Sequence, residues 1–406
     1  MNIWYKRKFY LNKILKYLDN TNLIKVLIWQ RRVWKSFIMK QIIDFLINSK
    51  KVNKKNIIYI NLEIDYIKYK DINDLDQYIK NYIKAEKIIW RLYLFVDEIQ
   101  ELSWWEKLIN AYRADDSFDV DIFITWSNAN LLSSDLSTYL AWRYIDFEIF
   151  PFSYVEYLEY HNLENSKSNF LNYLNTSWIP EIYKLEDFES KLNFLKSLKD
   201  SVILKDIVKR YNIKDIDLLE RLFFYLSWNI WNLFSLNSIV KKLKWLQIHT
   251  NTNTIWNYIN FLVKTYIIHW VDRYDLKWKK ILEWEKKYYL NDLAFNNFFS
   301  SSYDIWGWKK LENIVYNYLR QNWFNIYVWN IWDLEIDFVA EKWKDRIYIQ
   351  VAYLITDEVV MQREFWNLLK IKDNFPKYVI SLDEILIQDY KWIIHNNIWD
   401  FLSIIK

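Results

Sequence analysis

The chain has 406 residues, of which 52% are hydrophobic and 26% charged, and its formal net charge is +4 at pH 7. This length and composition indicate a globular protein with two or three domains and sizeable cores. The charge is too mild to argue for nucleic-acid binding by itself, and the absence of cysteine excludes disulfides and thiolate metal sites.

The sequence gives no sign of a membrane segment. No apolar run reaches the ~18 residues of a membrane span. The first residues, Met1 to Lys8, lack the apolar core of a signal peptide. We therefore expect a cytoplasmic protein with no membrane partner.

The first 150 residues alternate apolar strands with amphipathic helices. Because the strands are almost continuously apolar, we expect a parallel sheet covered by helices on both faces. The predicted strands are 23–28, 56–62, 91–98, 119–125 and 144–149, and the predicted helices are 8–19, 37–46, 71–87 and 104–112.

The remaining chain is first helical and then mixed. Helices followed by a basic hairpin leave a winged-helix interpretation open. The predicted helices are 204–211, 218–228, 235–246, 252–265, 311–321 and 364–369, and the predicted strands are 267–276, 286–291, 324–328, 335–340, 346–353 and 377–381. We expect a nucleotide-binding core at 1–150, a helical lid at 151–200, a helical and winged-helix-like region at 201–295, and a small α/β domain at 296–406.

A phosphate-loop pattern joins the first predicted strand to the next helix. Residues 29–36 end in Lys-Ser like the loop G-x-x-x-x-G-K-[ST], but both glycine positions hold tryptophan. In such a loop the lysine reaches the β- and γ-phosphates, the serine binds Mg²⁺, and the backbone cradles the phosphates of ATP. The predicted nucleotide-binding residues are Trp29, Gln30, Arg31, Arg32, Val33, Trp34, Lys35 and Ser36.

Composition indicates that most of the tryptophans stand for glycine. The chain has 25 Trp and 1 Gly, whereas ordinary usage predicts roughly 7% Gly, about 28 of 406 residues. We infer that UGA codons read here as Trp specify glycine in the source. A truly tryptophan-rich protein with a dead loop leaves the scarcity of glycine unexplained. Besides the loop, Trp126, Trp142, Trp178, Trp278, Trp329, Trp332 and Trp343 occupy glycine-like positions, whereas Trp105 and Trp399 lie in amphipathic helical contexts and are interpreted as genuine.

Polar residues flank the later strands of the predicted sheet. Asp97 and Glu98 end an apolar strand, where Asp97 is predicted to hold the Mg²⁺ shell and Glu98 to orient the attacking water. Asn128 follows the next strand and is predicted to sense the γ-phosphate. Arg143 is predicted to stabilise transition-state charge, within the subunit or across a subunit boundary. The alternative for each is a structural role, as a strand end, a turn residue or a surface ion pair.

At these residues the chain resembles the AAA+-superfamily ATPases of prokaryotes that carry a C-terminal domain of unknown function with a restriction-endonuclease-like core. The resemblance covers nearly the whole chain and rests on segments 25–36, 94–100, 124–128, 139–144, 149–153, 289–293, 311–316 and 335–339. It implies a P-loop NTPase sheet with helices on both faces, then a helical or winged-helix region and a small restriction-endonuclease-like α/β domain. It also implies ATP hydrolysis, but little about cellular purpose.

Glu312, Asp337 and Gln350 look like the metal ligands of a restriction-endonuclease-type site. Such sites also place a lysine two positions after the last ligand to position water, and here that position is Ala352. Lys342 or Lys344 could substitute for it. We expect this domain to lack nuclease activity and to bind a partner or nucleic acid.

The predicted function is Mg²⁺-dependent ATP binding and hydrolysis that switches the C-terminal half. Two alternatives are a DNA-binding regulatory protein with nucleotide as a ligand, and an ATP-gated metal-dependent nuclease. DNA, through the hairpin or the C-terminal domain, and a second copy of the chain are the expected partners. The lysines that could contact DNA phosphates are Lys277, Lys279, Lys280, Lys286 and Lys287.

Overall fold

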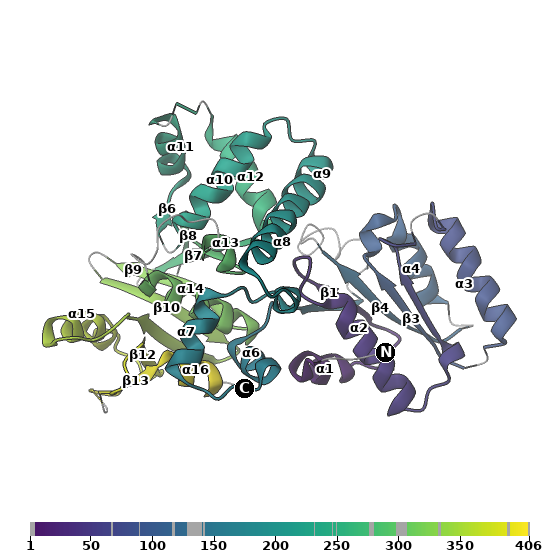
Figure 1. Cartoon of the computed structure of the whole chain (residues 1–406), viewed down its shortest axis with the longest axis horizontal. Coiled ribbons are helices and arrows are strands. Elements are labelled where there is room, and N and C mark those ends of the chain that lie inside the picture. Colours follow the sequence, from purple (N-terminus) through teal and green to yellow (C-terminus); the bar gives the residue numbers. More distant parts are fainter. Residues whose placement is uncertain are drawn as a thin grey trace. The chain divides into compact units, whose positions relative to one another are not determined.

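The computed structural model describes residues 5–65, 68–88, 90–115, 118–127, 140, 143–230, 232–245, 247–248, 250–275, 280–297, 307–331, 334–387 and 390–404. The chain divides into two compact units, Met1–Phe150 and Pro151–Lys406 (Figure 1). Every helix in the described part is too short or too polar to span a membrane.

The first unit is built on a five-stranded parallel sheet with strand order β2-β3-β4-β1-β5. Every residue of β1, β3 and β4 is buried, which explains their continuous apolar runs. The predicted P-loop NTPase fold is confirmed. The strands are β1 (Ile24–Ile28), β2 (Ile57–Asn61), β3 (Leu92–Asp97), β4 (Val120–Trp126) and β5 (Tyr144–Glu148).

Helices cover both faces of this sheet. Helices α1 and α2 pack together on one side, and α3 and α4 pack together on the other (Figure 1). This arrangement follows from right-handed crossovers that run in opposite directions from β1 to β2 and from β2 to β4. The helices are α1 (Lys8–Leu15), α2 (Lys35–Asn48), α3 (Ile72–Glu86) and α4 (Trp105–Ala114), with short 3₁₀ turns η1 (Lys54–Asn56) and η2 (Ile99–Glu101). The first helix ends earlier than the predicted 8–19.

The second unit combines helices with an eight-stranded sheet of order β13-β12-β11-β10-β9-β7-β8-β6. The strands are β6 (Leu233–Phe234), β7 (Ile268–Asp275), β8 (Lys280–Leu290), β9 (Asn325–Ile331), β10 (Leu334–Lys342), β11 (Asp345–Val351), β12 (Lys377–Ser381) and β13 (Ile393–Asn397). The helices are α6 (Tyr154–His161), α7 (Lys167–Asn175), η4 (Pro180–Lys184), α8 (Phe188–Asp200), the π-helical η5 (Ser201–Val208), α9 (Lys209–Tyr211), α10 (Ile216–Trp228), α11 (Leu236–Trp245), α12 (Thr252–Lys264), α13 (Ala294–Asn297), α14 (Gly307–Gln321), α15 (Glu358–Leu369) and α16 (Ile398–Ile404).

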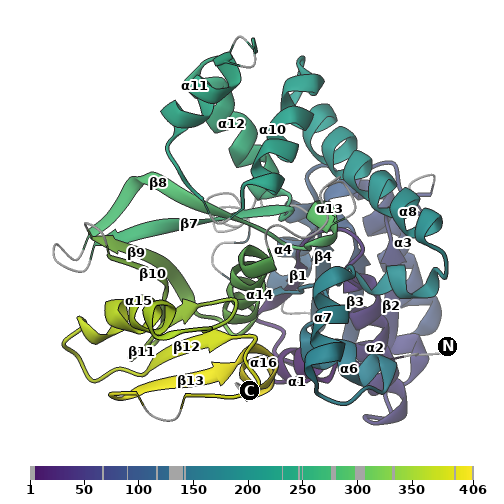
Figure 2. The same cartoon turned by 60° about the vertical axis from the view of Figure 1, so that its left-hand side comes forward.

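The hairpin that suggested a winged helix belongs to the C-terminal sheet instead. Strands β7 and β8 pair antiparallel, and β7 pairs parallel with β9 through Arg273 opposite Val328. Figure 2 shows the hairpin beside β9 and β10. The hairpin was predicted to lie in a different region from the strands after residue 296, because its pairing with β9 joins segments more than fifty residues apart.

Two side chains connect strand β8 and its following turn to other segments of the second unit. Asn313 on α14 accepts a hydrogen bond from the Leu290 amide at 2.7 Å and donates one to the Leu290 carbonyl at 2.9 Å. The fully buried carboxylate of Asp292 accepts hydrogen bonds from Ser177 Oγ at 2.6 Å and from the Trp178 amide at 2.9 Å. Asn313 and Asp292 thus hold neighbouring segments together inside the second unit. Both lie in segments that carry the family resemblance, 289–293 and 311–316, and these contacts give the two residues a structural role.

Candidate nucleotide-binding site

The loop between β1 and α2 lies at the carboxyl end of the parallel sheet. Its backbone has positive φ at Trp29 (146°), Arg32 (69°) and Trp34 (68°), and Trp34 caps α2 in the left-handed conformation. Glycine adopts these angles without a Cβ penalty. A turn of this kind before a helix directs backbone amides toward one point, which suits an anion. The loop therefore has the backbone of a phosphate cradle.

The two tryptophans of the loop pack against neighbouring rings. Trp29 is fully buried, with its ring 4.1 Å from that of Phe150, and the Trp34 ring lies 4.6 Å from that of Phe37. Each tryptophan has a Cβ atom although its backbone has a positive φ, and this conformation costs roughly 1–3 kcal/mol for a residue other than glycine. The cradle has the conformation of a phosphate loop, but these two side chains do not suit it.

Lys35 directs its ammonium into the loop. Its Nζ donates hydrogen bonds of 2.9 Å to the carbonyl oxygens of Trp29 and Gln30, and it lies 4.0 Å from Glu98 Oε1. The side chain is 3% exposed. The first turn of α2 thus places a buried positive charge beside two carbonyl oxygens and one carboxylate. Burial strengthens the attraction of this charge for an anion in the loop.

Asp97 is held rigidly at the end of β3. Its fully buried carboxylate accepts hydrogen bonds from Thr125 Oγ1 at 2.5 Å, Tyr59 Oη at 2.9 Å and Asn61 Nδ2 at 2.9 Å. Burial raises the pKa of the Tyr59 hydroxyl, and the charge of Asp97 raises it further. Three donors from two neighbouring strands therefore fix the orientation of this carboxylate.

Glu98 is held by residues of the next strand and turn. Its backbone is left-handed (φ 54°), and its amide donates to Thr125 Oγ1 at 2.8 Å. Its carboxylate accepts a hydrogen bond from Gln100 Nε2, which also donates to Ser127 Oγ at 3.0 Å. The two predicted acidic residues thus share Thr125 as a support, and Gln100 links Glu98 to the end of β4.

Arg31, predicted to bind nucleotide, pairs with two carboxylates. Its Nη1 lies 3.1 Å from Glu63 Oε1, and its Nη2 lies 3.8 Å from Glu101 Oε1. The remaining loop residues, Arg32, Val33 and Ser36, lie where the pattern predicted, with Ser36 in the first turn of α2. Asn128 and Trp142 fall outside the described residues.

Arg143 lies at the opposite end of the sheet from the loop. Strands β1 and β5 pair from Ile24 opposite Tyr144 to Ile28 opposite Glu148, so Arg143 precedes the pair and the loop follows it. The five residues of β5 span roughly 16 Å. An arginine cannot cover that distance, so the structure does not support the predicted role within one subunit.

Arg7 supports the loop from outside, and sequence reasoning missed it. Its buried guanidinium Nη1 donates to the carbonyl oxygen of Val33 at 3.1 Å and to that of Phe150 at 2.8 Å, and its amide donates to Gln41 Oε1 at 3.2 Å. Nothing in the local sequence separates Arg7 from its basic neighbours. Thr125 and Gln100 were also missed. Thr125 lies near the end of the strand after Asp97, and Gln100 is two residues after Glu98, so both positions were signals that could have found them.

These residues could hold a nucleotide with its metal. Lys35 and the loop amides present positive charge for phosphates, and Ser36 and Asp97 offer oxygens of the kind that Mg²⁺ prefers. Among the described residues, no group of three or more His, Asp or Glu side chains is arranged to hold a metal ion. A Mg²⁺ ion here would therefore take most of its ligands from the nucleotide and water, as is usual for this metal.

The predicted C-terminal metal ligands do gather, but around a lysine that the sequence analysis placed elsewhere. Lys287 Nζ on β8 lies 3.0 Å from Glu312 Oε1 and 3.7 Å from Asp337 Oδ1. Lys342, five residues along β10 from Asp337, lies roughly 16 Å away along the strand. The predicted substitution by Lys342 or by Lys344, farther still, is therefore wrong, and Lys287 is the lysine at this cluster.

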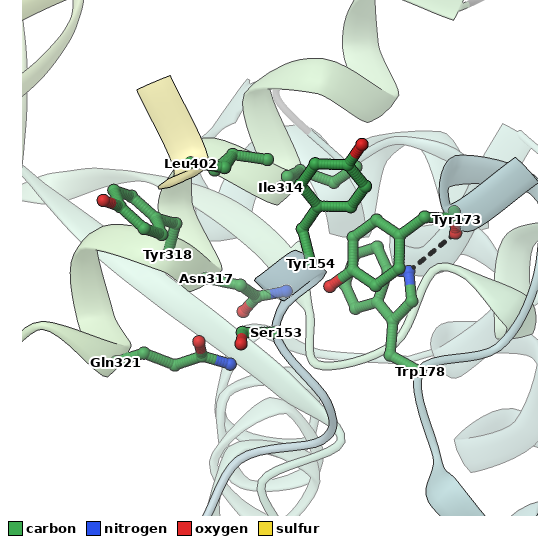
Figure 3. Close-up of a pocket in the computed structure, with 9 residues that line it drawn as sticks. All are labelled: Ser153, Tyr154, Tyr173, Trp178, Ile314, Asn317, Tyr318, Gln321 and Leu402. Atoms are coloured by element: carbon green, nitrogen blue, oxygen red, sulfur yellow. Dashed lines mark hydrogen bonds between the residues drawn. The ribbon is translucent and has the colours of Figure 1, made fainter. Parts of the chain in front are cut away.

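A small hollow in the second unit is lined by α6, α14 and the residues around Trp178 (Figure 3). Its volume is about 10 Å³, which suits one water molecule and no substrate. The indole of Trp178 is buried, stacks on Tyr173 with ring centroids 5.1 Å apart, and donates to the Tyr173 carbonyl at 2.9 Å. These contacts are those of a well-accommodated tryptophan, in contrast to the glycine predicted there.

Comparison with known proteins agrees with the fold and the loop. Residues 21–158 match the AAA domain family, and residues 167–301 match a domain of unknown function (DUF8612). The first unit therefore contains an AAA domain with the P-loop NTPase fold.

The family follows from whole-chain similarity. An uncharacterised protein of Haemophilus influenzae is 32% identical over 380 residues, which cover 92% of each chain. An uncharacterised protein of Methanocaldococcus jannaschii is 29% identical over 354 residues, 83% of this chain and 76% of that one. The chain belongs to the family of the Haemophilus protein. Among solved structures, the Aeropyrum pernix ORC1 protein in complex with DNA is 13% identical, covering 72% of this chain and 91% of that chain with a TM-score of 0.33.

Proposed function

We propose that the protein binds ATP with Mg²⁺ at the β1–α2 loop and hydrolyses it. The observation that carries this proposal is the position of Lys35, whose buried ammonium lies on the loop carbonyls and 4.0 Å from Glu98. The AAA domain match over residues 21–158 supports it independently. The test is phosphate release from ATP by the chain with glycine at positions 29 and 34, which Lys35→Ala should abolish.

The residues of the site divide the chemistry between them. Lys35 and the loop amides would hold the β- and γ-phosphates, while Ser36 and Asp97 would hold the metal and its water shell. Bound Mg²⁺ supplies neutralisation of the charge that develops on the phosphates. Glu98 would accept a proton from, or orient, the attacking water. Its amide is fixed by Thr125 and its carboxylate by Gln100, so the group is preorganised.

The same proposal requires glycine at positions 29 and 34. Among the described residues, sixteen other than glycine have positive φ, and six of these are tryptophan. Tryptophan makes up 25 of 406 residues, so its share would give about one. Glycine is the residue that such backbone positions prefer. The six are Trp29, Trp34, Trp104, Trp323, Trp343 and Trp392.

Turn geometry and buried indoles support this reading at particular positions. Trp343 lies in the tight turn between Lys342 and Asp345, which pair across β10 and β11, and its side chain is 98% exposed. Hairpin turns of this length favour glycine. The indole N–H groups of Trp126 and Trp329 are buried and find no hydrogen-bond partner in the part of the chain that the structure describes, a loss of about 1–3 kcal/mol each. A glycine would remove that loss.

The experiment for recoding is peptide mass spectrometry of the protein isolated from its source cells. Peptides that span residues 29–34 and 343 are expected to have the mass for glycine. Peptides that span Trp105 and Trp399 serve as the matched control, because both side chains are buried and were interpreted as genuine tryptophan. Tryptophan at 29 and 34 in the native protein would overturn the recoding and leave the loop unsuited to phosphate.

We further propose that hydrolysis switches residues 151–406 between two states. The support is the architecture, in which a nucleotide-binding unit is joined to a larger compact unit in one chain. Hydrogen exchange of the full chain would be compared with ATP in the Glu98→Gln variant and with ADP in the unchanged protein. Equal exchange throughout residues 151–406 in the two states would exclude a switch.

A further inference from the structure

A buried lysine in the second unit lies among three carboxylates. Lys287 is 3% exposed, and its Nζ lies 2.8 Å from Glu335 Oε1, 3.0 Å from Glu312 Oε1 and 3.7 Å from Asp337 Oδ1. Glu312 comes from α14, and the other two acids come from β10. The geometry is that of one cation held by oxygen ligands from two separate elements.

The cluster carries more negative than positive charge. Glu312 also accepts a 2.6 Å hydrogen bond from Tyr289 Oη, so one lysine faces three acids and a neutral donor. The surroundings therefore favour a cation and resist the loss of the one present.

A second observation at the same place also points to a cation ligand. Gln350 on β11 lies one residue beyond the pairing of Phe338 with Ile349, which sets it opposite Asp337. Its Nε2 donates to Glu364 Oε2 at 3.0 Å, while its Oε1 is buried without a hydrogen-bond partner among the described residues. A buried amide oxygen without a partner beside a carboxylate is an acceptor that a cation would satisfy.

We propose that this cluster is a cation site whose resident cation is the ammonium of Lys287. In the native protein the lysine closes the site to divalent metal ions. Without the lysine, Glu312, Asp337 and the free oxygen of Gln350 bind a hard divalent cation of the Mg²⁺ or Mn²⁺ class. In the second unit the charge of Lys287 then takes the place of a metal ion among these carboxylates, and the unit is not a metal-dependent nuclease.

The test measures Mn²⁺ binding to the full-length protein by electron paramagnetic resonance without nucleotide. The unchanged protein is expected to bind no Mn²⁺ that depends on Glu312. Lys287→Met is expected to have a lower Tm that Mn²⁺ raises, and to bind Mn²⁺ at least about tenfold more tightly than the unchanged protein. The matched control is Lys287→Met with Glu312→Gln, in which Mn²⁺ should neither bind at the cluster nor raise the Tm.

Two results would overturn the proposal. The first is Mn²⁺ binding by the unchanged protein that is lost in Glu312→Gln, since the cluster would then be a metal centre with the lysine in place. The second is a folded Lys287→Met that gains no Mn²⁺ affinity. If Lys287→Met does not fold even with Mn²⁺, the Lys287→Arg variant decides between charge and packing. A folded Lys287→Arg protein that is insensitive to Mn²⁺ supports a requirement for positive charge at this position. An unfolded Lys287→Arg protein shows that packing alone matters and contradicts the proposal.

Discussion

The hydroxyl of Thr125 donates a 2.5 Å hydrogen bond to the carboxylate of Asp97 at the carboxyl end of two inner strands of the AAA domain sheet. The same oxygen accepts the amide of Glu98 at 2.8 Å. One side chain on β4 thus positions both acidic residues at the end of β3. The relationship makes the acidic pair a rigid unit before any ligand arrives, and it makes Thr125 a positioning residue.

Removing that hydroxyl should loosen the site. Thr125→Val deletes a buried donor to a carboxylate and leaves the Glu98 amide unpaired, so we expect the free energy of unfolding to fall by about 1–3 kcal/mol. We also expect slower ATP hydrolysis because Asp97 and Glu98 lose their common support. Chemical denaturation and phosphate release measure the two effects. Thr125→Ser keeps the hydroxyl and should stay close to the unchanged protein; an equal loss there would contradict the hydrogen-bond explanation.

Glu98→Gln should separate ATP binding from hydrolysis. Because Glu98 is proposed to act on the attacking water, the change should lower kcat by about 10²–10⁴-fold. The affinity for ATP should change little, because Lys35 and the loop remain. Equilibrium binding and single-turnover hydrolysis on the same preparation check both. Loss of affinity with unchanged kcat would place Glu98 in binding rather than catalysis.

Arg143 should act in hydrolysis only across a subunit boundary. Its position at the far end of β5 prevents contact with the loop of its own chain. We therefore expect Arg143→Ala and Lys35→Ala to be inactive alone and to recover part of the activity when mixed, since each supplies what the other lacks. Full activity of Arg143→Ala by itself would show that the arginine has no catalytic part.

The buried Asp292 should make stability depend on pH. Burial raises its pKa to about 6, against the hydrogen bonds from Ser177 and three backbone amides that lower it. A carboxyl group whose pKa is higher in the folded than in the unfolded protein stabilises the folded state while it is protonated. For Asp292 this stabilisation is complete below the unfolded pKa of about 4 and is lost as the pH rises through about 6. Relative to Asp292→Asn, the unchanged protein should lose about 3 kcal/mol of unfolding free energy between these limits. Denaturation of both proteins across this window measures it, and a difference independent of pH would contradict it.

The fold of the first unit was largely predictable because its strands are short and continuously apolar. The same regularity placed Asp97 and Glu98 at a strand end, and Lys35 at the start of a helix. Arg7 was unpredictable, since its partners Val33 and Phe150 are remote in sequence and its own surroundings are uniformly basic. Local sequence patterns therefore predict strands, helices and the residues at their ends. They do not predict contacts between residues that are distant in the sequence.

The second unit was harder to predict for the same reason. Strand β13 (Ile393–Asn397) runs directly into helix α16 (Ile398–Ile404) without a turn signal. The helical context of Trp399 was recognised, but the strand before it was not expected. The pairing of β7 with β9 decides that the hairpin belongs to the C-terminal sheet, and no local pattern encodes it. That misassignment also hid Lys287 among presumed DNA contacts, whereas the structure buries it beside Glu312.

The most direct test is Mg²⁺-ATP binding by two versions of the full chain that differ only at positions 29 and 34. Trp29→Gly with Trp34→Gly should bind ATP and release phosphate, and both activities should depend on Lys35. The chain with tryptophan at both positions should do neither, because the left-handed turns then carry two indoles. Equal binding and hydrolysis by the two versions would contradict the claim that a bare backbone at these positions forms the phosphate cradle.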